Sequence, residues 1–294
     1  MATAKPVTST IPLKNRGDIE AIEMGRLLHS ILYEFYTELR KKKIVLQQCN
    51  DSDFAKAKKL IYQIASRQLE STAFKSPLTF YEKEKILVLG GNEEESVLFR
   101  FIENERKSGK DFIPQFFEVG FGRLRSEESD DELTTTEAIN VDGIKLRGKI
   151  DRIEVSEPSS SFNIVDYKLS GTKPTFGDLK NGISLQLPMY LYAAAELLTK
   201  KLNRPVSPNE MFIYSLKYNE KEFGRIKIGL AGKTKEERFG SVDELIENSL
   251  AHIKNYVRQI SEGKFNLSTL EDRENKVCRF CQFRKVCRID EVSA

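Results

Sequence analysis

Two adjoining segments, residues 144–155 and 162–168, constrain the fold most, because both alternate apolar and polar residues as strands do. A Pro/Ser turn joins them, which predicts a β-hairpin. Each segment carries an acidic residue where a buried strand would favour Val or Ile. On one strand Asp166 and Lys168 share a face, roughly 6.6 Å apart, and the hairpin places Asp151 alongside. Burying such charges without compensation costs roughly several kcal/mol per ion, so a purely structural role is unfavourable.

Carboxylate oxygens suit Mg²⁺ or Mn²⁺, and a neighbouring lysine can orient a water molecule or stabilise a phosphate under attack. Asp151, Asp166 and Lys168 are therefore candidates for a hydrolytic metal centre. The alternative is a salt bridge on the surface of a hairpin, which is the commoner explanation for the D-Y-K tripeptide taken alone.

Apolar periodicity predicts the elements around this hairpin. Helices are expected over residues 18–42, 53–71, 92–108, 182–201 and 241–263, and strands over residues 114–122, 134–140, 144–155, 162–168, 211–218 and 223–230. The four strands between residues 114 and 168 are expected to form a consecutive antiparallel meander. Residues 78–89 fit a helix or a strand. Helices before and after a central group of strands predict an α/β or α+β domain.

Composition narrows the class of protein. The 294 residues, 39% of them hydrophobic, can build a sizeable core, and the formal net charge of +3 does not by itself indicate a polyanionic partner. The sequence has no apolar run long enough to cross a membrane and no secretory leader pattern, so a cytoplasmic protein without a membrane partner is expected. Three of the four cysteines lie in the last 17 residues, which suits a metal or cluster site better than disulfides.

Three motifs stand in a characteristic order: GKIDRIE, VDYKLSG and QLPMY. Together they resemble the nuclease motifs of the RecB-type branch of the PD-(D/E)XK superfamily. The resemblance implies a restriction-endonuclease-like fold, with a central mixed sheet flanked by helices, and makes Asp151, Asp166 and Lys168 the metal and catalytic centre. Ile150 stands where the family name has proline, a departure that is ordinary in the RecB branch.

Further positions follow from the same resemblance. MGRLLHSIL resembles the G-x-x-x-H element and makes His29 a metal ligand that shifts the preference somewhat toward Mn²⁺, together with the Tyr167 carbonyl. Gln186 and Tyr190, four apart on a helix, resemble the Q-L-x-x-Y element that lies beside the active site and helps to hold DNA or the lysine. Glu118 resembles the acidic residue of the early core strand. Taken alone, His29 could be a core residue, Tyr190 a packing residue and Glu118 a solvated one.

The cysteine-rich tail carries a C-x₂-C-x₅-C pattern formed by Cys278, Cys281 and Cys287. It resembles the C-terminal element that binds a [4Fe–4S] cluster in AddB-type and CRISPR-associated RecB-like exonucleases. The family's fourth cysteine precedes the histidine element, but no cysteine precedes His29 here, which leaves Cys49 as the candidate unless the sequence is a fragment. A Cys₄ zinc site and reduced thiols in a helical cap are the alternatives.

The resemblance thus implies a Mg²⁺- or Mn²⁺-dependent deoxyribonuclease, expected to be an exonuclease of DNA repair or recombination. Single-stranded DNA or duplex ends would be the substrate, and a helicase subunit, or the rest of a larger helicase–nuclease chain, the partner. Three parts are expected: a helical region over residues 1–110, a nuclease core over 111–265 and a cysteine clasp over 266–294. The alternative is a non-catalytic DNA-end-binding or helicase-docking module, but such a relic would be expected to lose an acidic or lysine position, and none is lost.

Overall fold

The computed structural model describes residues 16–71, 86–87, 96–122, 126–158, 160–169, 173–217, 223–234, 237–264, 278 and 281. The chain divides into two compact units, Met1–His252 and Ile253–Ala294. The sheet and the helices before it all fall within the first unit. The three-part division at residues 110 and 265 stays a prediction, and Cys287 lies outside the described residues.

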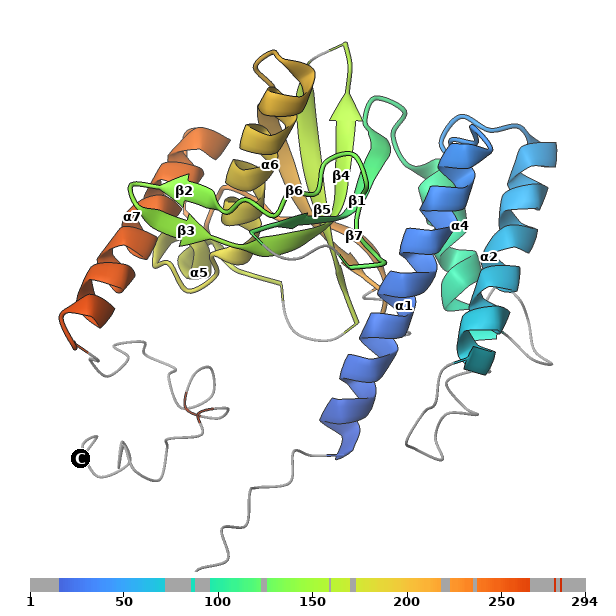
Figure 1. Cartoon of the computed structure of the whole chain (residues 1–294), viewed down its shortest axis with the longest axis horizontal. Coiled ribbons are helices and arrows are strands. Elements are labelled where there is room, and N and C mark those ends of the chain that lie inside the picture. The colour runs from blue at the N-terminus through green and yellow to red at the C-terminus, as the bar shows by residue number, and fades with distance from the viewer. Residues whose placement is uncertain are drawn as a thin grey trace, which may run out of the picture. The chain divides into compact units, whose positions relative to one another are not determined.

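A five-stranded mixed sheet forms the centre of the first unit, in the order β1-β4-β5-β6-β7 (Figure 1). Its strands are β1 (Ile113–Phe121), β4 (Gly148–Ser156), β5 (Ser161–Lys168), β6 (Ser207–Ser215) and β7 (Gly224–Lys227). Neighbouring strands are antiparallel except β5 and β6. A parallel pair needs a long crossover, and here the crossover holds two helices, α5 (Phe176–Lys180) and α6 (Gln186–Leu202). The mixed sheet flanked by helices confirms the predicted fold class.

The predicted meander of four consecutive strands is wrong at its second strand and at its third, residues 144–155, which is interrupted at Arg147 and divides between two sheets. β2 (Ile139–Val141) pairs instead with β3 (Ile144–Leu146) in a separate two-stranded sheet. The cause is a tight turn at Asp142 and Gly143, whose φ angles of 49° and 86° belong to the mirror-image turns that close short hairpins. β1 therefore pairs directly with β4.

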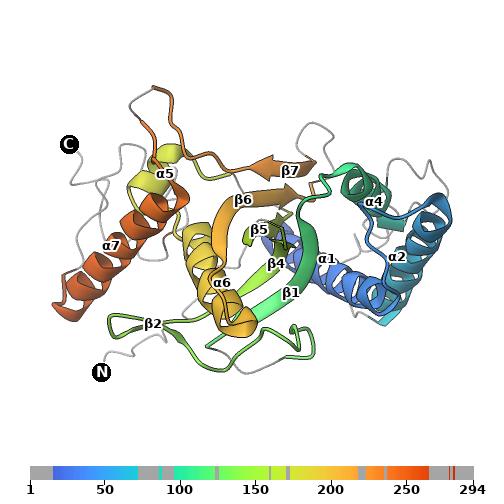
Figure 2. The ribbon, with the colours of Figure 1, turned by 90° about the horizontal axis from the view of Figure 1, so that it is seen from above.

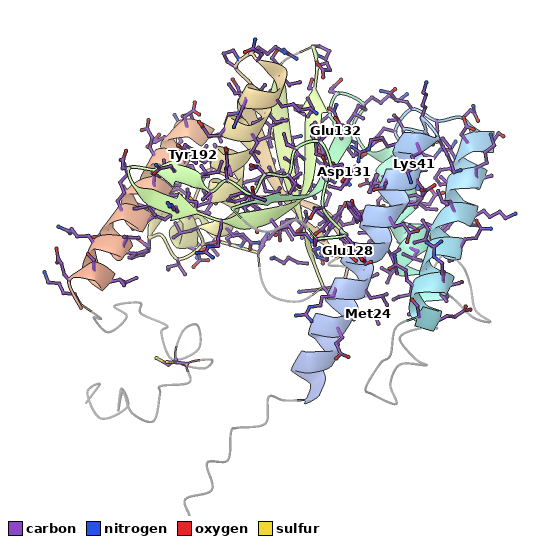
Figure 3. All side chains as sticks on the ribbon, in the orientation of Figure 1. Met24, Lys41, Glu128, Asp131, Glu132 and Tyr192 are labelled. Carbon is purple, nitrogen blue, oxygen red and sulfur yellow. The ribbon has the colours of Figure 1, made fainter. Side chains whose placement is uncertain are left out.

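The segment between β1 and β2 covers the outer edge of β1. Gly120 N donates to Thr134 Oγ1 (3.1 Å), Thr135 N donates to Gly120 O (2.9 Å), and Phe117 N donates to the carboxylate of Asp130 (3.4 Å). The segment also carries the acidic side chains labelled in Figure 3, which are Glu128, Asp131 and Glu132. An edge strand whose main chain is otherwise unpaired is thereby satisfied within the chain.

Helices cover the two faces of the sheet (Figure 2). On one face lie α1 (Arg16–Lys41), α2 (Asp51–Ser71) and α4 (Val97–Lys107), and their apolar stripes form one buried core with Phe117 and Val165 of the sheet. On the other face, α6 packs on the apolar side chains of β4 and β5, which include Ile150, Ile153 and Ile164. The first turns of α7 (Val242–Ser261) contribute Leu245 and Ile246 to this second core.

Most predicted helices have the expected extent, with two differences. The helix expected from residue 182 begins at Gln186, and the short α5 before it was not predicted, although a capping box formed by Thr175 and Asp178 marks its start. Of residues 78–89, the structure describes Ile86 and Leu87, which are helical.

A buried ion cluster lies between α1, α4 and the sheet. Arg152 of β4 is 0% exposed, and its Nη2 lies 2.7 Å from Glu105 Oε2 and 2.5 Å from Glu154 Oε1. Its Nη1 donates to the hydroxyl oxygens of Tyr36 (3.1 Å) and Tyr167 (3.3 Å). One guanidinium thus links one residue of α1, one of α4 and one of β5 to β4.

The second carboxylate of this cluster has its own partners. Arg225 of β7 donates from both terminal nitrogens to Glu154, at 2.8 and 2.6 Å, and Asn163 donates to the same carboxylate at 3.4 Å. Glu105 in turn accepts a hydrogen bond of 2.6 Å from the Tyr36 hydroxyl. The charges are therefore paired, which is the condition under which an interior tolerates them.

Replacing Arg152 by methionine should destabilise the protein by about 3–5 kcal/mol, because Glu105 then remains buried with a neutral hydroxyl as its partner. Urea unfolding measures the change. A second substitution, Glu105→Gln, should recover much of the loss by removing the stranded charge. The matched control is Arg204→Met, which breaks an exposed ion pair with Glu157 and should cost less than about 1 kcal/mol. Equal losses in Arg152→Met and Arg204→Met would contradict a structural role for the cluster.

Candidate active site

The candidate site lies where β4 and β5 stop pairing. Arg152 and Val165 are the last paired residues at this end, and Asp151 and Asp166 come next on their strands. The Tyr167 backbone N–H donates to Asp151 Oδ2 at 2.8 Å, which fixes the first carboxylate against the second strand. The hairpin therefore brings the two predicted carboxylates to the same end of the sheet.

His29 of α1 faces this end of the sheet. Its Nδ1 lies 3.2 Å from Glu118 Oε1 and 3.7 Å from Asp151 Oδ1, and its Nε2 lies 3.2 Å from the carbonyl oxygen of Tyr167. One ligand atom from each of His29, Glu118 and Asp151 lies within 4.8 Å of the other two. Imidazole nitrogen and carboxylate oxygen are suitable donors for Mn²⁺ and, through the oxygens, for Mg²⁺, so these residues fit a divalent cation.

Both strands that supply the carboxylates change face at the site. On β1, Phe116 and Val119 belong to the same core although they are three residues apart, and Glu118 between them has a φ of 53°. On β4, Ile150 and Ile153 likewise belong to one core. A left-handed conformation costs a residue with a side chain about 1–2 kcal/mol, and such strain concentrates at functional sites. The irregularity turns Glu118 and Asp151 toward His29.

The second carboxylate has a separate set of partners. Asp166 Oδ2 lies 2.8 Å from Lys168 Nζ, and its Oδ1 accepts a hydrogen bond of 2.8 Å from Gln186 Nε2. Gln186 also accepts from Lys168 Nζ at 3.2 Å and reaches the Tyr190 hydroxyl at 3.2 Å. The first residue of α6 therefore joins the carboxylate, the lysine and the tyrosine that the sequence singled out.

Burial and the proximity of three carboxylates dominate the electrostatics of the site. Burial raises the pKa of Asp151 to about 7; nearby Asp166 and Glu118 add to the rise, and His29 opposes it. Burial alone would lower the pKa of His29, but the hydrogen bond to Glu118 and the charge of Asp151 raise it to about 9. A protonated imidazole thus stands where negative charge accumulates, as a bound cation would.

Two residues of the site were not predicted from the sequence. Lys149 Nζ lies 2.5 Å from Glu118 Oε2 and neutralises part of its charge. Gly148 is required by packing, since a Cβ at this position would lie 2.7 Å from the ring of Phe121 and 3.3 Å from that of Tyr190. The glycine of the GKIDRIE motif was a sequence signal for Gly148. The pairing of Lys149 with Glu118 had no such signal, because it depends on the irregular geometry of β1 and β4.

The structure describes three of the four cysteines, Cys49, Cys278 and Cys281. Cys49 follows α1 and is half-buried, with its thiol donating to the Leu46 carbonyl at 3.3 Å, and burial raises the pKa of that thiol. In the second unit, Cys281 N donates to Cys278 O at 3.2 Å, so a tight turn holds these two cysteines. The third cysteine of the pattern, Cys287, is not among the described residues. A shared cluster stays a prediction.

Comparison with known proteins agrees with the resemblance seen in the motifs. The family model of the PD-(D/E)XK nuclease superfamily matches residues 9–288. Proteins named as subunits of an ATP-dependent helicase/deoxyribonuclease are similar along most of the chain. The one from Alkaliphilus metalliredigens is 20% identical over 91% of this chain, that from Carboxydothermus hydrogenoformans 24% over 92%, and that from Bacillus pumilus 23% over 93%.

The chain spans only about a quarter of these relatives. It covers 27%, 28% and 27% of their respective lengths. Among the described helices, none is both long and apolar enough to cross a membrane.

Replacing His29 by alanine should weaken the binding of Mn²⁺ by at least about tenfold, because the imidazole supplies one ligand atom of the candidate site. The thermal midpoint of the metal-free protein should also fall at neutral pH, because the raised pKa of His29 means that its protonated form stabilises the fold there. Calorimetric titration and thermal unfolding measure the two quantities. The control is His252→Ala, the chain's other histidine, which should titrate like the unchanged protein. Equal affinities in all three proteins would leave His29 with a structural role alone.

Proposed function

The chain belongs to the PD-(D/E)XK nuclease superfamily, and from that premise we propose that it hydrolyses phosphodiester bonds in DNA with a divalent cation held by His29, Glu118 and Asp151. The observation that carries the proposal is the convergence of these three ligand groups beside the Asp166–Lys168 pair. The Tyr167 carbonyl, the further ligand that the motif implies, lies 3.2 Å from His29 Nε2, the ring nitrogen opposite the one that faces Glu118 and Asp151. When bound, a divalent cation supplies Lewis-acid chemistry, which stabilises negative charge on phosphoryl oxygens and lowers the pKa of water.

Lys168 is placed to act on the nucleophile or on the phosphate. Its ammonium has three donors, of which Asp166 and Gln186 take two, and its side chain is 40% exposed. The remaining donor can point outward to an attacking water or a phosphoryl oxygen. Asp166 keeps the ammonium charged and in place, and Gln186 fixes the pair by donating to Asp166 and accepting from Lys168.

Glu118 and Tyr190 have supporting roles in this proposal. Glu118 accepts from His29 through one oxygen and pairs with Lys149 through the other, so it orients the imidazole and offers a ligand atom. Burial raises the pKa of Tyr190 to about 12, so the hydroxyl is neutral at physiological pH and acts as a hydrogen-bonding group beside Gln186. In this proposal neither Glu118 nor Tyr190 acts as a general acid or a general base.

The biological setting follows from the relatives. Their name couples a helicase with a deoxyribonuclease, and the chain corresponds to about a quarter of each. We propose that this chain cuts DNA ends as an exonuclease, with Mg²⁺ or Mn²⁺, alongside a helicase. The competing hypothesis is a DNA-end-binding module without activity. The complete set of His29, Asp151, Asp166 and Lys168 favours the enzyme.

Asp151→Asn, Asp166→Asn and Lys168→Ala should each lower DNA cleavage by about 10²–10⁴-fold or more, because each removes a charged group from the reacting centre while nearly preserving the fold. Labelled single-stranded and duplex DNA, incubated with Mg²⁺, Mn²⁺ or EDTA, reports both the rate and the strand preference. Asp53→Asn, on α2, is the control and should cut normally. Wild-type rates in all three site variants would refute the nuclease function.

We further propose that Cys278, Cys281 and Cys287 bind a [4Fe–4S] cluster, with Cys49 as the candidate fourth ligand. The turn that holds Cys278 and Cys281 supports a shared metal, as does the softness of thiolate ligands. Protein purified without oxygen should then be brown and contain about four irons per chain. Replacing Cys281 by alanine should remove both colour and iron.

The same measurement separates the alternatives. Colourless protein with one zinc ion per chain would indicate a zinc site in place of the cluster. If Cys49→Ala keeps its iron while Cys281→Ala loses it, Cys49 is not the fourth ligand. A variant without cysteines that melts and cuts like the wild type would rule out any metal clasp.

A further inference from the structure

Three cations stand on one face of the segment that leads from β3 into β4 and to Asp151. They are Lys145 at the centre of β3, Arg147 between the strands and Lys149 at the start of β4. The residues between them turn to the other face: Ile150 is fully buried in the core under α6, and Leu146 packs against that core. The missing Cβ of Gly148 would point at residues of the same core. Because side chains alternate along an extended chain, the three cations face away from α6.

This cationic row ends at the candidate metal site. Lys149 contacts Glu118, and Asp151 is the next residue but one. Successive cations are about 6.6–6.8 Å apart along the strand, so the row extends about 13 Å outward from Lys149. A ligand lying along it would be led directly to the reacting centre.

The outer two cations differ from Lys149, which pairs with Glu118. Lys145 and Arg147 are exposed, and neither forms an ion pair with a described residue. Some exposed cations elsewhere on the same unit do pair with acids, as Lys200 does with Glu137, Lys201 with Glu132 and Arg204 with Glu157. Unpaired, evenly spaced positive charge that points to a hydrolytic site suits a ligand with evenly spaced negative charges.

We propose that Lys145, Arg147 and Lys149 bind consecutive phosphates of one nucleic-acid strand and deliver it to the metal site. This inference rests on the proposed nuclease function and specifies the strand's path. A single row suits one strand, since its charges lie along one line. Contacts of this kind are made to the sugar–phosphate backbone and are independent of base sequence.

The test uses the full chain with Lys145→Gln and Arg147→Gln combined, which leaves Lys149 and the metal ligands unchanged. The charge-matched control combines Lys56→Gln and Lys59→Gln on α2. Binding of a fluorescein-labelled 20-nucleotide oligothymidylate is measured in EDTA, across a series of salt concentrations. Losing two phosphate contacts should reduce the salt slope by about 1.4 and weaken binding at 0.1 M salt by about 25-fold.

Cleavage of the same oligonucleotide with Mn²⁺ separates binding from chemistry. KM should rise while kcat stays within about twofold of the wild type, because neither changed residue lies in the reacting centre. If the double variant has a lower thermal midpoint than the control, the single variant Lys145→Gln replaces it in the test. Its salt slope of binding should then be reduced by about 0.7. A slope and KM equal to those of the control would overturn the cationic row and leave the nuclease function standing. A wild-type protein that neither binds nor cuts DNA would overturn both.

Discussion

The buried guanidinium of Arg152 is the contact on which the rest of the structure depends. It joins α4 through Glu105, α1 through Tyr36 and β5 through Tyr167, all at a depth that water does not reach. Tyr36 lies two helical turns after His29 and on the same side of α1. The Tyr167 hydroxyl accepts a hydrogen bond from Arg152 in the cluster, and the Tyr167 backbone N–H donates to Asp151 in the site. The position of the imidazole over the carboxylates is thus set by an ion cluster on the inner side of the sheet.

The site gathers three carboxylates, and the protein pairs them unevenly. His29 and Lys149 share Glu118, and Lys168 pairs with Asp166, while Asp151 relies on one backbone N–H and a histidine 3.7 Å away. Burial is the main cause of its raised pKa, and the nearby carboxylates of Asp166 and Glu118 add to the rise. Such an arrangement is unfavourable for a carboxylate that only supports the fold, and favourable for one that waits for a cation.

The sequence revealed the residues of the site better than their geometry. The motif residues His29, Asp151, Asp166 and Gln186 do lie together, because strand alternation and helix periodicity are local rules. The alternation of side chains fails at Glu118, because the left-handed backbone of this residue turns the next residues of β1 to the other face of the sheet. No local sequence pattern predicts this. The separate β2–β3 hairpin, by contrast, was readable from Asp142-Gly143, a turn dipeptide that outweighs the apolar pattern around it. Long-range pairing, such as that of Lys149 with Glu118, depends on the irregular geometry of β1 and β4. It is therefore seen only in the folded structure.

The covered edge of β1 has a consequence for how this sheet can meet other molecules. Its outward main-chain groups at Phe117 and Gly120 are already bonded to Asp130, Thr134 and Thr135. At these positions β1 offers no unpaired backbone groups to a strand from another chain. The sheet is therefore protected from edge-to-edge association on the side nearest the candidate site. Whatever approaches that edge, nucleic acid or protein, must be recognised through side chains and loops, where charge and shape can discriminate, because backbone pairing accepts almost any sequence.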